Sequence, residues 1–159
     1  MKHISDLVAS FEKKLAMILM FFMAVVVTLA VIFRYIFNDP LVWAGETSVF
    51  LLVAISFLGG SLGLKYKSQA AVTIVIDFVP EQVRKWLLIL GHVLMLTFLV
   101  VFLFYSYKWI FSPSVAIQKS SAMLLPMWIP YSSVPIGLSF ATIHLFANLL
   151  DLVRGGESK

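Results

Sequence analysis

The stretch LAMILMFFMAVVVTLAVIF, residues 15–33, decides the fold class of this sequence. Its 19 residues contain no Asp, Glu, Lys, Arg or His, and Lys14 and Arg34 bound it. At about 1.5 Å of rise per residue, a helix of this length crosses the roughly 30 Å hydrocarbon core of a bilayer. The run is longer than the apolar core of a secretory signal, about 7 to 15 residues, and no small-residue cleavage site follows. It therefore predicts an uncleaved membrane-spanning helix.

Three more stretches are long and apolar enough to cross a bilayer. Residues 47–64 and 120–150 carry no formal charge, and residues 86–107 contain one histidine, His92. Prolines crowd the beginning of the last stretch, so its helix is expected from residue 127 onward. A chain with 61% hydrophobic and 13% charged residues agrees with this reading. We expect an all-α membrane protein, a single membrane domain over residues 1–159 with spans at about 13–37, 42–64, 83–107 and 127–150.

Positive charge orients the predicted spans. Nine of the twelve Lys and Arg residues precede the first span, separate the second from the third, or follow the fourth. The positive-inside rule then predicts a multi-pass membrane protein with both termini and the central loop in the cytoplasm. The net charge of +4 serves this orientation, and no nucleic-acid partner is expected. Residues 69–79 are too short to span and too apolar for a free loop, so they predict an amphipathic segment lying in the interface.

Two helix faces carry the residues expected to meet other helices. In the second span, Gly59, Gly60 and Gly63 form a small-residue face, where backbones approach closely in lipid. In the fourth span, a stripe with 4-3-4-3 spacing is too polar for lipid and should face other helices of this chain or a partner. Its members are Gly137, Ala141, His144, Asn148 and Asp151.

The connection between the first two spans, RYIFNDPLVWAGE at residues 34–46, is the most distinctive motif. Arg34 and Tyr35 can anchor the end of the first helix, and Trp43 the beginning of the second. Glu46 lies in the first turns of that second helix, where the helix dipole favours a carboxylate. Arg34 is the predicted counter-ion of Glu46. The alternative is that Glu46 is a dipole partner with no further duty.

This motif, followed by Phe57-Leu58-Gly59-Gly60 and Gly63, resembles the small four-helix subunit of tripartite ATP-independent periplasmic (TRAP) transporters. The resemblance covers residues 12–152, and the segments at 76–78 and 80–85 are most similar to the sialic-acid branch. One departure is Gln69-Ala70-Ala71, where many relatives have a histidine. The resemblance implies a sodium-coupled importer of sialic acid or a C4-dicarboxylate. In it, a large elevator-type membrane subunit binds substrate and sodium, and a soluble periplasmic protein delivers the substrate.

On this reading, the chain is a scaffold without a cofactor or metal of its own. Its structural or partner-contacting candidates are Arg34, Tyr35, Trp43, Glu46, Gly59, Gly60, Gly63, His144 and Asn148. No nucleophile–base pair, carboxylate dyad, metal-ligand cluster or phosphate-binding glycine loop is recognisable, so no enzyme activity is expected. Two alternatives remain open at this point: a haem held between His92 and His144, and a four-helix anchor subunit of some other complex.

Overall fold

A computed structural model of the chain describes residues 2–66 and 81–153, and most of these residues are helical. Four of its helices, counting α6 and α7 as one span, are long and apolar enough to cross a membrane. The predicted all-α membrane fold is confirmed. The helices are α1 (Lys2–Tyr35), α2 (Val42–Lys65), α4 (Glu81–Ile110), α5 (Pro113–Ala116), α6 (Trp128–Tyr131) and α7 (Ser133–Val153).

The helices differ from the predicted spans mainly at the beginning of α1 and the beginning of α7. The first helix begins at Lys2, and its 34 residues give about 51 Å of length, well beyond the hydrocarbon core. The expected fourth helix is divided at Ser132 into the short α6 and the long α7. The second span matches α2 to within one residue. The predicted interfacial segment at 69–79 lies outside the described residues.

The first helix ends where its sequence turns polar. Asn38 has a φ of 52°, a left-handed conformation that asparagine tolerates better than most residues. The Asp39 N–H returns to the Phe33 carbonyl at 3.1 Å. Proline at position 40 disfavours helix for the residue before it, so the chain turns and α2 begins at Val42.

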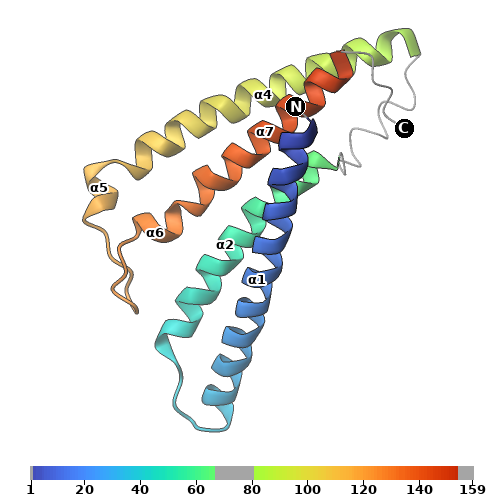
Figure 1. The fold of residues 1–159 in the computed structure, drawn as a ribbon. Coiled ribbons are helices and arrows are strands. Elements are labelled where there is room, and N and C mark those ends of the chain that lie inside the picture. Colours follow the sequence, from blue (N-terminus) through green and yellow to red (C-terminus); the bar gives the residue numbers. More distant parts are fainter. Residues whose placement is uncertain (1, 67–80, 154–159) are drawn as a thin grey trace.

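The four long helices form a row in the order α1, α2, α7, α4. Extensive contacts join α1 to α2, α2 to α7, and α7 to α4, whereas α1 touches α7 over a much smaller area. Figure 1 shows the α1–α2 pair and the α4–α7 pair meeting near the two chain ends and diverging toward their loops. We call the end near Ser5, Lys65 and Asn148 the inner end, and the end with the 36–41 and 111–127 loops the outer end.

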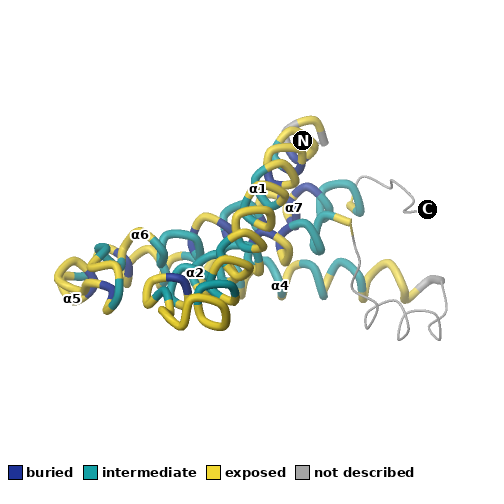
Figure 2. The backbone as a smooth tube through the Cα atoms, turned by 90° about the horizontal axis from the view of Figure 1, so that it is seen from below, coloured by how far each residue is buried: buried dark blue, intermediate teal, exposed yellow. Residues whose placement is uncertain are grey.

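Burial is concentrated in α7, the helix with long neighbours on both sides. A third of its most apolar window is buried, against 6% in α1 and in α4. Figure 2 shows exposed backbone positions along most of these two edge helices. Large apolar side chains such as Phe21 (67% exposed) and Phe98 (69% exposed) project from them. Both faces of the row therefore carry apolar side chains that no other described residue covers.

Candidate functional site

The outer end is organised by the carboxylate of Glu46. Its Oε2 accepts a hydrogen bond from the Ser120 hydroxyl at 2.8 Å and from the Ala122 amide at 3.1 Å. Its Oε1 accepts one from the Ser121 amide at 3.0 Å, and the Met123 amide lies 3.3 Å from Oε2. Four donors therefore converge on one side chain, and they bind the loop before α6 to the first turns of α2.

The 118–127 loop is shaped to present these donors. The Ser120 amide bonds to the Leu125 carbonyl and the Met127 amide to the Gln118 carbonyl, so the loop closes as a narrow hairpin. Successive amides at its tip then point to one side and form a concave anion-binding surface. Thr47, one residue after Glu46, adds a contact from its hydroxyl to the Met123 sulfur at 3.1 Å. The position of the Glu46 carboxylate in α2 follows from the sequence, whereas its hydrogen-bond donors are known only from the fold.

Arg34 is not the partner of Glu46, so the predicted counter-ion pair is wrong. Its guanidinium lies 5.7 Å from the centre of the neighbouring Tyr35 ring, and both side chains are exposed at the end of α1. Trp43 is 38% exposed at the beginning of α2. The 120–123 loop satisfies Glu46, which leaves Arg34 and Tyr35 exposed at the outer end of α1.

Gly59 and Gly60, on the glycine face of α2, have open space around them among the described residues. A Cβ added at Gly59 or Gly60 would meet no atom within 4 Å, so the predicted seam faces outward at these positions. The close approach occurs at Gly137 of α7 instead. A Cβ there would lie 2.7 Å from the Phe57 Cβ and 3.2 Å from its carbonyl carbon. The seam between α2 and α7 therefore depends on the glycine of α7.

The polar stripe of α7 faces the other helices, as predicted. Gly137, Ala141 and His144 are buried, and Asn148 is partly buried. The Asn148 amide donates to the Leu64 carbonyl at the end of α2 at 2.9 Å. That bond satisfies one of the carbonyls that every helix end leaves without an intrahelical partner.

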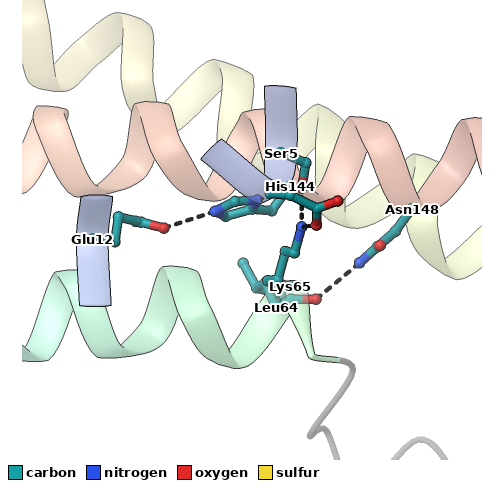
Figure 3. Close-up of polar contacts among 7 residues, drawn as sticks. Ser5, Glu12, Leu64, Lys65, His144 and Asn148 are labelled. Carbon is teal, nitrogen blue, oxygen red and sulfur yellow. Dashed lines mark hydrogen bonds and ion pairs between the residues drawn. The ribbon is translucent and has the colours of Figure 1, made fainter. Parts of the chain in front are cut away.

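At the inner end, His144 joins three helices in one hydrogen-bonded cluster (Figure 3). Its Nε2 lies 2.7 Å from Glu12 Oε2, and its Nδ1 lies 2.8 Å from the Ser5 hydroxyl, both on α1. Lys65, at the end of α2, donates to the same Ser5 hydroxyl at 2.8 Å and to the Asp6 carboxylate. The side chains of Glu12 and His144 are fully inaccessible to solvent.

The cluster contradicts the haem alternative. Both ring nitrogens of His144 are within hydrogen-bonding distance of α1 side chains, which leaves neither as an axial ligand for iron. His92 has its Nδ1 at 2.8 Å from the Leu88 carbonyl within its own helix. A haem held between the two histidines would therefore require the His144 contacts to break.

Sequence reasoning identified His144 and Asn148 but missed Ser5, Glu12, Lys65 and Ser120. Glu12 precedes two lysines and looks like ordinary flanking charge. A usable signal was present, because Ser5, Ala9 and Glu12 share one face of a helix by their 4-3 spacing, and all three are buried. Ser120 carried no such signal, since its role depends on a loop geometry that spacing does not reveal.

Four apolar helices, held in a row by polar contacts at both ends, define a multi-pass membrane protein. The family model for the DctQ component of tripartite ATP-independent periplasmic transporters matches residues 23–155. The chain belongs to this family. Its four apolar helices agree with a multi-pass protein of the inner membrane.

Curated relatives agree with this assignment. The chain is 25% identical to the C4-dicarboxylate TRAP transporter small permease protein DctQ of Vibrio cholerae, over 79% of this chain and 63% of that one. It is 28% identical to the isethionate TRAP transporter permease protein DctMQ of Oleidesulfovibrio alaskensis, over 92% of this chain and 24% of that one. It is 23% identical to the sialic acid TRAP transporter small permease protein SiaQ of Vibrio cholerae, over 99% and 92% respectively. The chain thus spans less than two thirds of the first two relatives.

Proposed function

We propose that this chain is the small membrane subunit of a TRAP transporter, acting as a fixed scaffold beside a larger membrane subunit that moves the substrate. The observation that carries the proposal is the row of helices, whose two apolar faces are uncovered. A mobile transport domain needs a stationary wall, and a row stiffened by polar contacts at its inner and outer ends can widen that wall. Lipid covers whatever part of the row the larger subunit does not.

The isethionate relative supports a larger membrane partner. Nearly all of this chain aligns with about a quarter of that permease protein, so most of the relative lies outside the match. We infer that a separate, larger chain supplies the corresponding part here. The exposed Gly59–Gly60 face of α2 is a candidate contact, because a second helix can approach closely there.

The transported solute is proposed to be an organic anion. The relatives are named for C4-dicarboxylates, isethionate and sialic acid, and all three are organic acids. Sialic acid is our first candidate, on the sequence of residues 76–78 and 80–85. Sodium coupling belongs to the larger subunit in this proposal, and the small subunit binds no cofactor.

The proposed orientation puts the inner end in the cytoplasm and the Glu46 loop in the periplasm. The support is the positive-inside rule, since the inner end gathers Lys13, Lys14 and Lys65. The outer surface with Arg34 and Tyr35 is then available to the soluble protein that delivers the substrate.

The test is co-purification of the tagged chain in mild detergent, followed by identification of its partner and uptake in liposomes. We expect a membrane protein much larger than this chain, and organic-anion uptake that needs sodium, both membrane chains and the periplasmic protein. Recovery of an unrelated enzyme complex would favour the anchor-subunit alternative, and uptake by the large chain alone would refute the scaffold role.

Two charge-reversal variants test whether the outer surface binds the periplasmic protein. Reversing the exposed charge in Arg34→Glu should reduce uptake without preventing assembly, while Lys14→Glu, exposed at the opposite end, should not act through the periplasmic protein. We would measure the concentration of periplasmic protein that gives half-maximal uptake. Equal values for wild type and Arg34→Glu would exclude Arg34 from that contact.

A further inference from the structure

A hollow of about 400 Å³ lies at the outer end of the row, between the end of α4 and the beginning of α7. The short helices α5 and α6 lie at this same end (Figure 1). Ile110 and Pro135 are buried and line its inner part, whereas Phe111 and Trp128 are exposed and stand at its rim. Its size falls in the range of small-molecule sites, about 300–1,000 Å³. The hollow is therefore large enough to hold a ligand.

The lining of the hollow suits an apolar ligand. Two of its side chains carry hydroxyls, and both already make a hydrogen bond. The Ser132 hydroxyl donates to the Ile129 carbonyl at 2.6 Å, and the Tyr107 hydroxyl lies 3.1 Å from that of Ser139. The remaining side-chain polar group of the lining is the indole N–H of Trp128, a donor at the rim. An occupant must therefore be apolar over its buried part, with hydrogen-bond acceptors only where it emerges.

The depth of the hollow in the membrane indicates a lipid. The candidate spans Val83–Ile110 and Trp128–Val153 each have one end at a residue of its lining. The hollow thus lies where the hydrocarbon core meets the headgroup layer, and Tyr107 and Trp128 are typical of the aromatic belt at that level. A phospholipid at this depth has its acyl chain beside the apolar lining. Its ester and phosphate oxygens, which are acceptors, lie beside the rim.

Positive charge near the hollow favours an anionic headgroup. Lys108, the basic residue in the last turn of α4, is exposed and lies three positions before Phe111 of the lining. Its long side chain carries the ammonium toward the headgroup layer. Residues 107–136 contain no Asp or Glu. Their other cation, Lys119, directly precedes the loop that binds the Glu46 carboxylate, so a negative charge is already held close to it. Lys108 is therefore the cation available to a phosphate.

We propose that the hollow is a lipid-binding site, which takes one acyl chain of an anionic phospholipid from the leaflet at the outer end while Lys108 binds the phosphate. The acyl chain fills space between α4 and α7 that the side chains of this protein leave open. It joins the edge helix α4 to the centre of the row beside the Tyr107–Ser139 hydroxyl pair. The site requires only that the chain spans a bilayer, and it is independent of the transported solute.

Fluorescence quenching of Trp128 in vesicles tests the proposal. Phenylalanine replaces the other three tryptophans of the sequence, Trp43, Trp86 and Trp109. The full chain is reconstituted in phosphatidylcholine with a minor fraction of brominated phosphatidylglycerol or, in a parallel sample, of brominated phosphatidylcholine with the same acyl chains. One lysine near a membrane surface favours an anionic lipid about fivefold, so we expect brominated phosphatidylglycerol to quench with about fivefold higher apparent affinity. Equal quenching by the two lipids would overturn the proposal.

Two pairs of variants separate the contact with the headgroup from the contact with the acyl chain. Lys108→Gln should abolish the preference for phosphatidylglycerol, whereas Lys119→Gln should keep it. Ala116→Phe places a ring in the hollow and should lower quenching by brominated phosphatidylglycerol to the phosphatidylcholine level. Ile117→Phe, at an exposed neighbouring position outside the lining, should not. An unchanged preference in Lys108→Gln, or unchanged quenching in Ala116→Phe, would refute the site as described.

The same measurement on the complex with the larger subunit distinguishes a lipid from a protein occupant. A preference for phosphatidylglycerol that persists after assembly supports the lipid. A preference that is lost on assembly would assign the hollow to a side chain of the larger subunit and overturn the proposal. Failure to recover any larger subunit would contradict the proposed function, while the result on the isolated chain would still decide the lipid site.

Discussion

Replacing Gly137 with alanine tests whether the α2–α7 seam is set by direct backbone approach. The added methyl would lie 2.7 Å from the Phe57 Cβ, 3.2 Å from its carbonyl carbon and 3.3 Å from its carbonyl oxygen. Carbon atoms in contact prefer about 3.5–4.0 Å. The helices must therefore separate locally by about 1 Å, and the atoms in the way belong to the backbone and Cβ, which cannot rotate aside. Overpacking of this kind costs about 1–3 kcal/mol.

Gly59→Ala is the matched control, because the same methyl there meets no atom within 4 Å. Alanine also favours helix over glycine by up to about 1 kcal/mol, so this variant should be as stable as wild type or slightly more stable. The assay is equilibrium unfolding of the isolated chain in a defined bilayer or detergent, with the free energy of unfolding compared among the three proteins. A Gly137→Ala protein within 0.5 kcal/mol of Gly59→Ala, a margin typical of neutral surface changes, would show that α7 does not rely on close approach to Phe57.

Three further predictions follow from the contacts at the two ends of the row. Glu46→Leu removes the acceptor of the 120–123 donors, so amide hydrogen exchange of residues 118–127 should accelerate at least tenfold, whereas Glu46→Gln should retain part of the protection. Equal exchange rates in both variants and in wild type would show that Glu46 does not hold this loop. Asn148→Leu leaves the Leu64 carbonyl without its donor and should lower the free energy of unfolding by about 0.6–1.7 kcal/mol, while the exposed Ile143→Leu on the same helix should be neutral. Reporter fusions after residue 159 should be active in the cytoplasm and a reporter inserted at residue 38 in the periplasm, and the reverse pattern would overturn the orientation.

The fold was largely predictable from the sequence, because hydrophobic length alone determines which segments cross a bilayer. Residues 15–33 and 47–64 contain no charged group, and no soluble arrangement hides such segments. The inward face of α7 was also predictable, since His144 and Asn148 need polar partners that lipid cannot provide. Which partners they would find was not predictable. Glu12 and His144 are 132 positions apart, and only the packing of α1 near α7 brings them together.

One prediction failed and another stays a prediction, both for general reasons. The Gly59–Gly60 pattern reveals that a helix can be approached closely, but the pattern does not say from which molecule the neighbour comes. Arg34 was predicted to be the counter-ion of Glu46 because it is positively charged and close in sequence. Three of the four actual donors are backbone amides of a loop more than 70 residues away, and almost every residue has such an amide whatever its side chain. Contacts made by the backbone leave no signature in residue identities.

The distribution of polar contacts along the row has a mechanical consequence for a scaffold. Apolar helices gain little from associating with one another in lipid, so specific contacts must hold their register. The α2–α7 seam has the Gly137–Phe57 approach and the Asn148 bond at the inner end, and the hydrogen bonds of Glu46 tie the outer end of α2 to the loop before α6. The edge helix α4 is joined to α7 near the outer end by the Tyr107–Ser139 hydroxyl pair and to α6 by the Trp109–Tyr131 ring contact. The edge helix α1 has its polar ties to α7 and α2 at the inner end, through Glu12, Ser5 and Asp6. Among the described contacts, α7 is therefore tied to its neighbours at both ends, whereas α1 has the fewest polar contacts to hold its outer half in register.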